Sequence, residues 1–276
     1  MIALGAMPPT RALAQDPAPG DDRTVVPRDT ANRERRQTLF TYRDAILAAG
    51  FAGVTVAMFP LDKRLAGDIR QDSTFNRLAQ SSAVGFETIS TPGAYIIGGA
   101  LYLYGRLAKK PDVADFGWHG TEAVFVAMGA TGFLKGVLGR ARPYVSNATN
   151  PRDFRFGGGF STSDRQSFPS GHTTTAFAAA SAVTSEVRRL RPKALPYVAT
   201  VMYGGATLVG LSRMYHDKHW ASDVALGAAI GTFSGLKVVR YSHAHPENMI
   251  DRVILRTTLA PDGRGGGYVG FVLPIP

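Results

Sequence analysis

The stretch LSRMYHDKHWASDVALG, residues 211–227, combines side chains whose types and spacing are suited to catalysis. His219 and Asp223 are four residues apart, so on a helix they lie on one face. An aspartate at that position accepts a hydrogen bond from one imidazole nitrogen, fixes the tautomer and makes the other nitrogen a better nucleophile. Arg213 adds a planar fork of N–H donors for phosphate oxygens. The stretch therefore predicts a nucleophilic histidine beside a bound anion. The simpler alternative is that these are polar residues at a helix end with no catalytic role.

A metal site is a third interpretation of this stretch, because His216 and His219 are three residues apart with Asp217 between them. The basic neighbours oppose a cation, and no second cluster of ligands follows elsewhere in the sequence. We therefore predict no metal site here and interpret His216 as a loop residue. The remaining histidines are expected to be surface or terminal polar residues: His119, His243 and His245.

A second block, KGVLGRARP, places Lys135 near the end of an apolar helix and Arg142 seven residues later. A lysine in an apolar helix is costly unless it meets an anion or reaches solvent. The ordinary explanation is a lysine that extends to solvent where Pro143 ends the helix. Taken alone, the block favours that explanation.

A third block, SFPSGHTTTAF, precedes another helix and places Ser170 as its N-cap. The free N–H groups of a helix start, with Gly171 allowing close approach, form a site for an anion. A serine hydroxyl and the imidazole of His172 are suited to a phosphate oxygen and its leaving group. An ordinary Pro-Ser-Gly turn that caps a helix explains the block equally well.

The three blocks occur in the order K-x6-RP, PSGH and SR-x5-H-x3-D. In this combination the chain resembles the type 2 phosphatidic acid phosphatase and vanadium haloperoxidase superfamily over roughly residues 40–245. The resemblance implies a helical bundle in which the three blocks meet at one phosphate pocket. It implies no cofactor for a phosphatase, and vanadate only for a haloperoxidase.

The resemblance also implies a role for each matched residue. His219 is expected to be the nucleophile that forms a phosphohistidine, and Asp223 to orient it. His172 is expected to protonate the leaving oxygen and then to activate water. The phosphate oxygens are expected to contact Lys135, Arg142, Ser170, Gly171 and Arg213.

Six apolar segments are expected to form the helices that position these blocks: 45–61, 91–108, 121–139, 172–187, 194–211 and 219–239. No alternation of strands and helices is found, so we predict an all-α six-helix bundle. Segments 45–61 and 194–211 approach the roughly 20 apolar residues that a membrane span needs. This favours membrane association.

The two ends of the chain differ in composition from the middle. Residues 1–38 contain a short apolar run, an Ala-x-Ala pattern at 12–14 and a Pro-rich lead-in, which predict a signal-like and flexible segment. Residues 39–245 are predicted to be the helical phosphatase domain. In residues 246–276, alternating apolar residues flank Pro261-Asp262-Gly263, which predicts a β-hairpin tail.

The segment between the second and third blocks is long and contains three arginines: Arg152, Arg155 and Arg165. One hypothesis is a mobile rim that binds a further anionic group of the substrate. A solvated surface loop is an equal alternative.

The net charge of +10 favours an anionic partner, and the absence of a Lys/Arg-rich run argues against nucleic acid. The absence of cysteine excludes disulfides and cysteine metal sites. We expect a metal-independent phosphatase that acts on a phosphorylated lipid or small-molecule phosphate in a bacterial-type cell envelope, with the active site on the periplasmic side. The alternatives are a soluble periplasmic acid phosphatase of wide specificity, a vanadate-dependent haloperoxidase, and a non-catalytic lipid-binding envelope protein.

Overall fold

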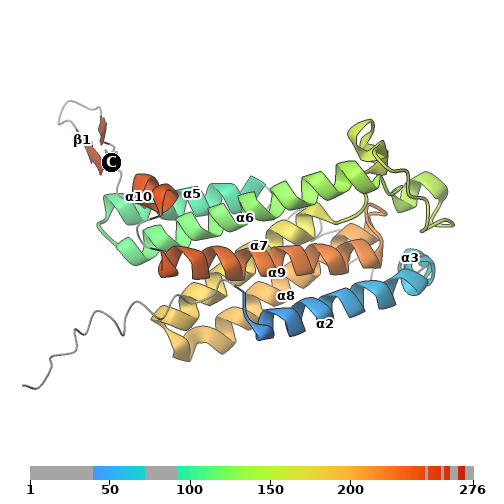
Figure 1. Cartoon of the computed structure of the whole chain (residues 1–276), viewed down its shortest axis with the longest axis horizontal. Helices are drawn as coiled ribbons and strands as arrows, with labels where there is room; N and C mark the ends of the chain where they lie inside the picture. Colours follow the sequence, from blue (N-terminus) through green and yellow to red (C-terminus); the bar gives the residue numbers. More distant parts are fainter. Residues whose placement is uncertain (1–39, 72–91, 246–247, 256–257, 262–266, 271–276) are drawn as a thin grey trace, which may run out of the picture. The chain divides into compact units, whose positions relative to one another are not determined.

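Six long helices build most of the part that the computed structural model describes, which is residues 40–71, 92–245, 248–255, 258–261 and 267–270 (Figure 1). All of these residues lie in one compact unit, Thr38–Pro276. The predicted signal-like segment lies outside the described residues. The six helices are α2 (Tyr42–Met58), α5 (Pro92–Leu107), α6 (Pro111–Leu138), α7 (Gly171–Leu190), α8 (Leu195–Tyr215) and α9 (Ala221–Ala244).

The prediction of a helical bundle is confirmed, and each predicted apolar segment corresponds to one of these helices. Helix α6 begins ten residues earlier than predicted, with Pro111 in its first turn, where a proline costs no hydrogen bond. The predicted count of six is too low, because the short helices α3 (Asp62–Gln71) and α10 (Met249–Leu255) are also present. Both are too polar or too short to be found from an apolar segment.

Two short strands follow α10. Strand β1 (Thr258–Pro261) pairs antiparallel with β2 (Gly267–Gly270), with Leu259 opposite Val269. This is the pairing that the two arms of the predicted hairpin require, and the connecting residues 262–266 lie outside the described part of the chain.

Helices α7 and α9 pack backbone to backbone, because glycines recur every fourth residue on one face of α9: Gly227, Gly231 and Gly235. A Cβ atom on Gly231 would lie 2.3 Å from the Thr174 carbonyl oxygen, and one on Gly235 would lie 2.6 Å from that of Ala178. Small residues at this spacing let two helices approach closely. The contacts advance along both helices together, so α7 and α9 are parallel and their N-termini meet at one end.

Helix α6 runs antiparallel to α7 and α9. Near its C-terminus, the Thr131 hydroxyl donates to that of Thr174 in the first turn of α7. Near its N-terminus, His119 contacts Glu186 in the last two turns of α7. Between these contacts the three helices share an alanine- and valine-rich core that includes Ala123, Ala178 and Val239. The end of α6 therefore meets the starts of α7 and α9.

Four helical stretches in the described residues are long and apolar enough to cross a membrane: Tyr42–Ile69, Pro111–Leu138, Pro192–Tyr215 and Ala221–Ala244. Within Ala221–Ala244, 61 % of the most apolar window is buried in the protein, against 6 % within Tyr42–Ile69. Helix α9 is therefore central, and α2 presents most of its apolar surface outward. These four stretches indicate a membrane protein.

Candidate active site

The three sequence blocks converge where α6 ends and α7 and α9 begin. A Cβ atom on Gly171 would lie 3.7 Å from the Cε atom of Lys135, so the start of α7 lies against the lysine side chain. The backbone N–H of Ser170 donates to the carbonyl oxygen of Asp223 over 3.0 Å. The fold thus brings together residues that are almost 90 positions apart in the sequence.

His219 lies buried in the turn before α9, with 3 % of its surface exposed. Its Nδ1 atom is 2.7 Å from the carbonyl oxygen of Ser167 and 3.6 Å from Oδ2 of Asp223. A carbonyl oxygen only accepts hydrogen bonds, so Nδ1 carries the proton and Nε2 keeps its lone pair. The sequence predicted that Asp223 would accept this hydrogen bond, and in the structure the nearest acceptor is the Ser167 carbonyl.

The electrostatic surroundings of His219 keep its imidazole neutral. Burial lowers the pKa of His219 to about 3, and the positive charges of Lys135 and Arg142 act in the same direction, against the opposing effect of Asp223. At neutral pH the Nε2 lone pair is therefore free to attack, which is the state that a nucleophilic histidine requires.

Asp223 is fully buried and is held by three donors. Its Oδ1 atom accepts from Arg140 over 2.5 Å, and its Oδ2 atom accepts from the Ser167 hydroxyl over 2.5 Å and from the Trp220 backbone N–H over 2.8 Å. The last bond caps the start of α9. Ser167 thus contacts both Asp223, through its hydroxyl, and His219, through its carbonyl.

Arg140 is the main residue that the sequence analysis missed, because it lies within the six-residue spacer of the K-x6-RP block. It is completely buried and forms ion pairs with Asp62 over 2.6 Å and with Asp223 over 2.5 Å. Asp62 also accepts from the backbone N–H of Ser222 over 2.8 Å. Four aromatic rings surround the guanidinium at 4.9–5.6 Å: Phe59, Phe154, Phe168 and Trp220. The one sequence signal is its place directly after Gly139, which ends α6 with a φ of 56°.

Three predicted phosphate ligands place positive charge beside His219. The Lys135 ammonium donates to the carbonyl oxygen of Gln166, and Arg142 Nε donates to that of Ser163 over 2.9 Å. Arg213 is 5 % exposed near the end of α8, and the charges of Arg142 and Arg213 both act on Lys135. Three cations this close repel one another, so a bound anion would stabilise them.

The start of α7 has the predicted residues at the predicted positions. Ser170 is the N-cap, but its buried hydroxyl pairs with the hydroxyl of Thr173 over 2.8 Å and does not cap the backbone. Gly171 and His172 are the first two residues of the helix, and His172 is half-buried. The first N–H groups of a helix and its positive dipole end favour an anion at this position.

The long segment before α7 is tied to the site by backbone hydrogen bonds. Gly157 N–H donates to the Val137 carbonyl over 2.7 Å, and Ser167 N–H donates to that of Arg140 over 3.1 Å. Arg165 forms a two-pronged ion pair with Asp153 over 3.0 and 3.2 Å. Of the three arginines considered as a rim, only the other two are exposed: Arg152 and Arg155. The segment thus supports Lys135 and Arg142, and its possible contact with a substrate stays a hypothesis.

One of the remaining histidines, His119, is not the surface residue that the sequence analysis expected, whereas His243 is partly exposed near the end of α9. His119 is 2 % exposed, and both His119 and His243 contact the buried carboxylate of Glu186. The expectation failed because their partner is 67 residues from His119 in the sequence. His245 is exposed, as expected.

Comparison with known proteins identifies relatives of part of this chain. The sequence profile of the PAP2 superfamily matches residues 117–247. A lipid A 1-phosphatase from Porphyromonas gingivalis is 42 % identical over 69 residues, which is 25 % of this chain and only 15 % of that protein. The crystal structure of a transmembrane PAP2-type phosphatidylglycerolphosphate phosphatase from Bacillus subtilis aligns with a TM-score of 0.49 and 21 % identity, over 74 % of this chain and 97 % of that one.

Proposed function

On the premise that this chain belongs, through residues 117–247, to the PAP2 superfamily, we propose that it is a membrane phosphatase that hydrolyses a phosphomonoester or diphosphate of a lipid. The reaction would proceed through a phosphohistidine and use no metal. The observation that carries this proposal is the position of His219: a buried, neutral imidazole whose Nδ1–H is held by a carbonyl and whose neighbours are cations.

In the first step, Nε2 of His219 attacks the phosphorus atom and the bond from phosphorus to the leaving oxygen breaks. The leaving oxygen keeps the electron pair and takes a proton from the imidazolium of His172. Lys135, Arg142 and Arg213 would neutralise the three remaining oxygens, which is the main requirement of phosphoryl transfer. Asp223 would stabilise the positive charge that develops on His219.

In the second step, the neutral His172 takes a proton from a water molecule as the water oxygen attacks phosphorus. The bond from phosphorus to Nε2 breaks, its electron pair returns to His219, and inorganic phosphate leaves. His172 ends the cycle protonated, as it began, so one histidine serves as acid and then as base.

An apolar cavity of about 270 Å³ among α5, α6, α7 and α8 supports a lipid as the substrate. Two of its lining residues, Ala176 and Val209, lie one helical turn from His172 and Arg213, respectively. A lipid whose phosphate lies at the active site would thus have apolar surface directly beside it. The lipid A 1-phosphatase, whose name describes a lipid phosphate substrate, is consistent with this class.

The experiment that tests the proposal is phosphate release by the purified protein in detergent and EDTA. The substrates are a phosphatidic acid, an isoprenyl diphosphate and p-nitrophenyl phosphate. We expect hydrolysis in EDTA, a preference for a lipid substrate, and a loss on the order of 10⁴-fold or more in His219→Ala. His216→Ala, a histidine replacement three residues away, is the matched control and should keep its activity.

A second readout examines the intermediate itself. After a brief reaction with a ³²P-labelled substrate, the wild-type chain should retain label that acid removes and alkali does not, and His219→Ala should retain none. Equal rates in the wild type and His219→Ala would overturn the mechanism. No release of phosphate by the folded protein would redirect the work to vanadate-dependent halide oxidation or lipid binding.

We also propose that the active site faces the periplasm, so that the start of α2, which pairs with the end of α9 through Asp44 and Lys237, lies on the cytoplasmic side. Cleavage at the Ala-x-Ala pattern of residues 12–14 would instead leave the start of α2 in the periplasm, and a labelling experiment decides between the two orientations. The chain has no cysteine, so a single introduced cysteine reports its own location. Ser163→Cys, at the active-site end, should react in intact cells with a membrane-impermeant maleimide that reaches the periplasm. Lys193→Cys, between α7 and α8 at the other end, should react only after lysis, and the reverse pattern would contradict the proposal.

A further inference from the structure

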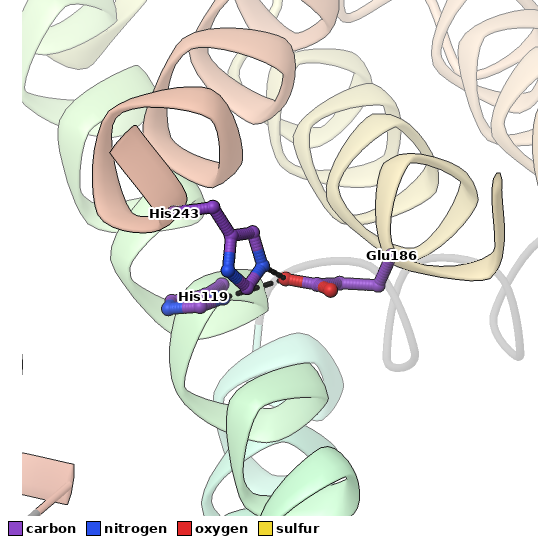
Figure 2. Close-up of side chains that lie close together, drawn as sticks. All are labelled: His119, Glu186 and His243. Atoms are coloured by element: carbon purple, nitrogen blue, oxygen red, sulfur yellow. Dashed lines mark hydrogen bonds and ion pairs between the residues drawn. The ribbon is translucent and has the colours of Figure 1, made fainter. Parts of the chain in front are cut away.

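A second polar cluster lies at the opposite end of the same three helices (Figure 2). His119 of α6, Glu186 of α7 and His243 of α9 point toward one another. Oε1 of Glu186 is 2.6 Å from Nδ1 of His119 and 2.7 Å from Nε2 of His243. These three atoms all lie within 4.8 Å of one another. None of the three residues has a role in the proposed reaction.

We propose that His119, Glu186 and His243 form a zinc site that ties α6, α7 and α9 together at the end of the bundle opposite the active site. The ion would join the three helices, and the test of this site is independent of the proposed phosphatase activity.

The donor atoms are those that zinc prefers. Two imidazole nitrogens and one carboxylate oxygen are borderline donors, which suit Zn²⁺ better than Mg²⁺ or Ca²⁺. Three protein ligands leave a fourth position of the tetrahedron for water. Each ligand comes from a different helix, so one ion would join three elements that are distant in the sequence.

The groups around the ligands are arranged as the outer partners of a metal site. Oδ2 of Asp251, on α10, lies 3.8 Å from Nε2 of His119, the ring nitrogen that faces away from Glu186. At this distance the nitrogen has no hydrogen-bond partner, so Asp251 would have to move closer to act as the carboxylate that fixes the tautomer of a metal-bound histidine and raises its basicity. Asp251 is itself held by Trp118 Nε1 over 2.8 Å and by Asn248 Nδ2 over 2.6 Å. Arg189 Nε contacts Oε2 of Glu186 over 3.3 Å, which leaves Oε1 facing the two imidazoles.

The local charge favours a cation. The groups whose charges act around the cluster include four carboxylates and one guanidinium: Asp115, Glu122, Glu186, Asp251 and Arg189. The C-terminal turns of α7 and α9 also end here, and the negative ends of their dipoles add to the attraction. Buried carboxylates are stabilised by a positive partner, which is either a protonated imidazole of the cluster or a bound cation.

The geometry allows an ion to enter after a small adjustment. Zinc bonds of about 2.0–2.1 Å place tetrahedral ligands roughly 3.3 Å apart, so the two nitrogen–oxygen distances, now 2.6 and 2.7 Å, must lengthen by roughly 0.6–0.7 Å. The side chains of His119 and Glu186 are 2 % and 1 % exposed, and that of His243 is 29 % exposed. The half-buried His243 can therefore make this movement and gives the ion a route from solvent.

The cluster is too far from His219 to take part in the reaction. His119 and Lys135 lie 16 residues apart on α6, which corresponds to about 24 Å at the helical rise of 1.5 Å per residue. Removal of the ion should therefore change the stability of the bundle and leave the chemical step intact.

The experiment uses the full-length protein, purified in detergent with an affinity tag that contains no histidine. Zinc content is measured by mass spectrometry after dialysis, affinity by competition with a chromophoric chelator, and Tm with and without added ZnCl₂. The variant is His243→Gln, whose amide can still donate to Glu186 but is a poor zinc ligand. His245→Gln, an exposed histidine two residues away on the same helix end, is the matched control.

We expect about one zinc ion per chain in the wild type and in His245→Gln, with a Tm that rises by several degrees on zinc addition. His243→Gln should bind zinc on the order of 100-fold more weakly or not at all, and its Tm should not respond. Equal zinc binding in His243→Gln and the wild type would overturn the proposal. So would a wild-type protein that holds no zinc and shows no Tm shift, since a hydrogen-bonded cluster without metal would then account for the contacts.

Discussion

At the active-site end of α6, Lys135 lies among the positive charges of Arg142 and Arg213. At the other end, His119 lies between the carboxylates of Glu186 and Asp251. The same three helices form both ends: the first holds the starts of α7 and α9, and the second holds their final turns. Parallel helices therefore present two positive dipole ends on one side and two negative ends on the other.

The comparison shows that one arrangement of helices can create two polar sites, one with surroundings that favour an anion and one with surroundings that favour a cation. The glycine face of α9 sets α7 and α9 parallel, and their side chains then reinforce the sign of each end. The proposed phosphate would bind at the first end and the proposed zinc ion at the second. Substitutions that act at one end should leave the other unchanged, because about 24 Å of helix separates them.

The largest effect is expected from Arg140→Ala, which should destabilise the folded structure at the active-site end. Asp62 and Asp223 would both lose their buried ionic partner, which typically costs about 3–5 kcal/mol. The free energy of unfolding in detergent measures this loss. Arg152→Ala, an exposed arginine of the adjoining segment, should change stability by less than about 0.5 kcal/mol, and a similar loss in both variants would contradict the role assigned to Arg140.

Asp223→Asn should lower kcat by roughly 10²–10³-fold, with little change in KM. The loss should be smaller than in His219→Ala, because the Ser167 carbonyl still holds the Nδ1–H of His219. Steady-state kinetics of the two variants on one substrate provide the measurement. If Asp223→Asn were as inactive as His219→Ala, the carbonyl would not be sufficient to fix the tautomer.

Asp251→Asn tests whether zinc binding at the other end is independent of catalysis. Loss of the carboxylate behind His119 should weaken zinc binding by roughly 10–100-fold, while kcat stays within about twofold of the wild type. The chelator competition and a standard assay of the same preparation measure both quantities. If kcat fell while zinc affinity did not change, Asp251 would support catalysis and not zinc binding, which would contradict the roles assigned to the two ends.

The smallest effect is expected from reversing the charges of Arg152 and Arg155. If these exposed residues contact an anionic part of the substrate, the double change to glutamate should raise KM several-fold for diphosphates or anionic lipids. The kcat for p-nitrophenyl phosphate should not change. An unaltered KM for every substrate would favour the solvated-loop alternative.

Much of the helical framework was predictable, because each long helix contains a largely apolar segment that polar breaks separate from the next. The exceptions have a local cause: α3 has five charged residues among ten, and α10 has only seven residues. The three blocks that contain the predicted site residues also converge, where α6 ends and α7 and α9 begin. Which of them contact each other was not predictable, as the role of Ser167 illustrates.

The sequence by itself determined the approximate position of the long helices and the three blocks of residues from which the chemistry is proposed, because apolar segments and motif spacing are local properties of the chain. Only the tertiary structure decided the partners of buried charges. Arg140 meets Asp223 across 83 residues, Ser222 meets Asp62 across 160, and His119 meets Glu186 across 67. No local pattern encodes these pairs, because they depend on which elements the fold brings together: the start of α3 and the loop after α6 with the start of α9, and α6 with α7.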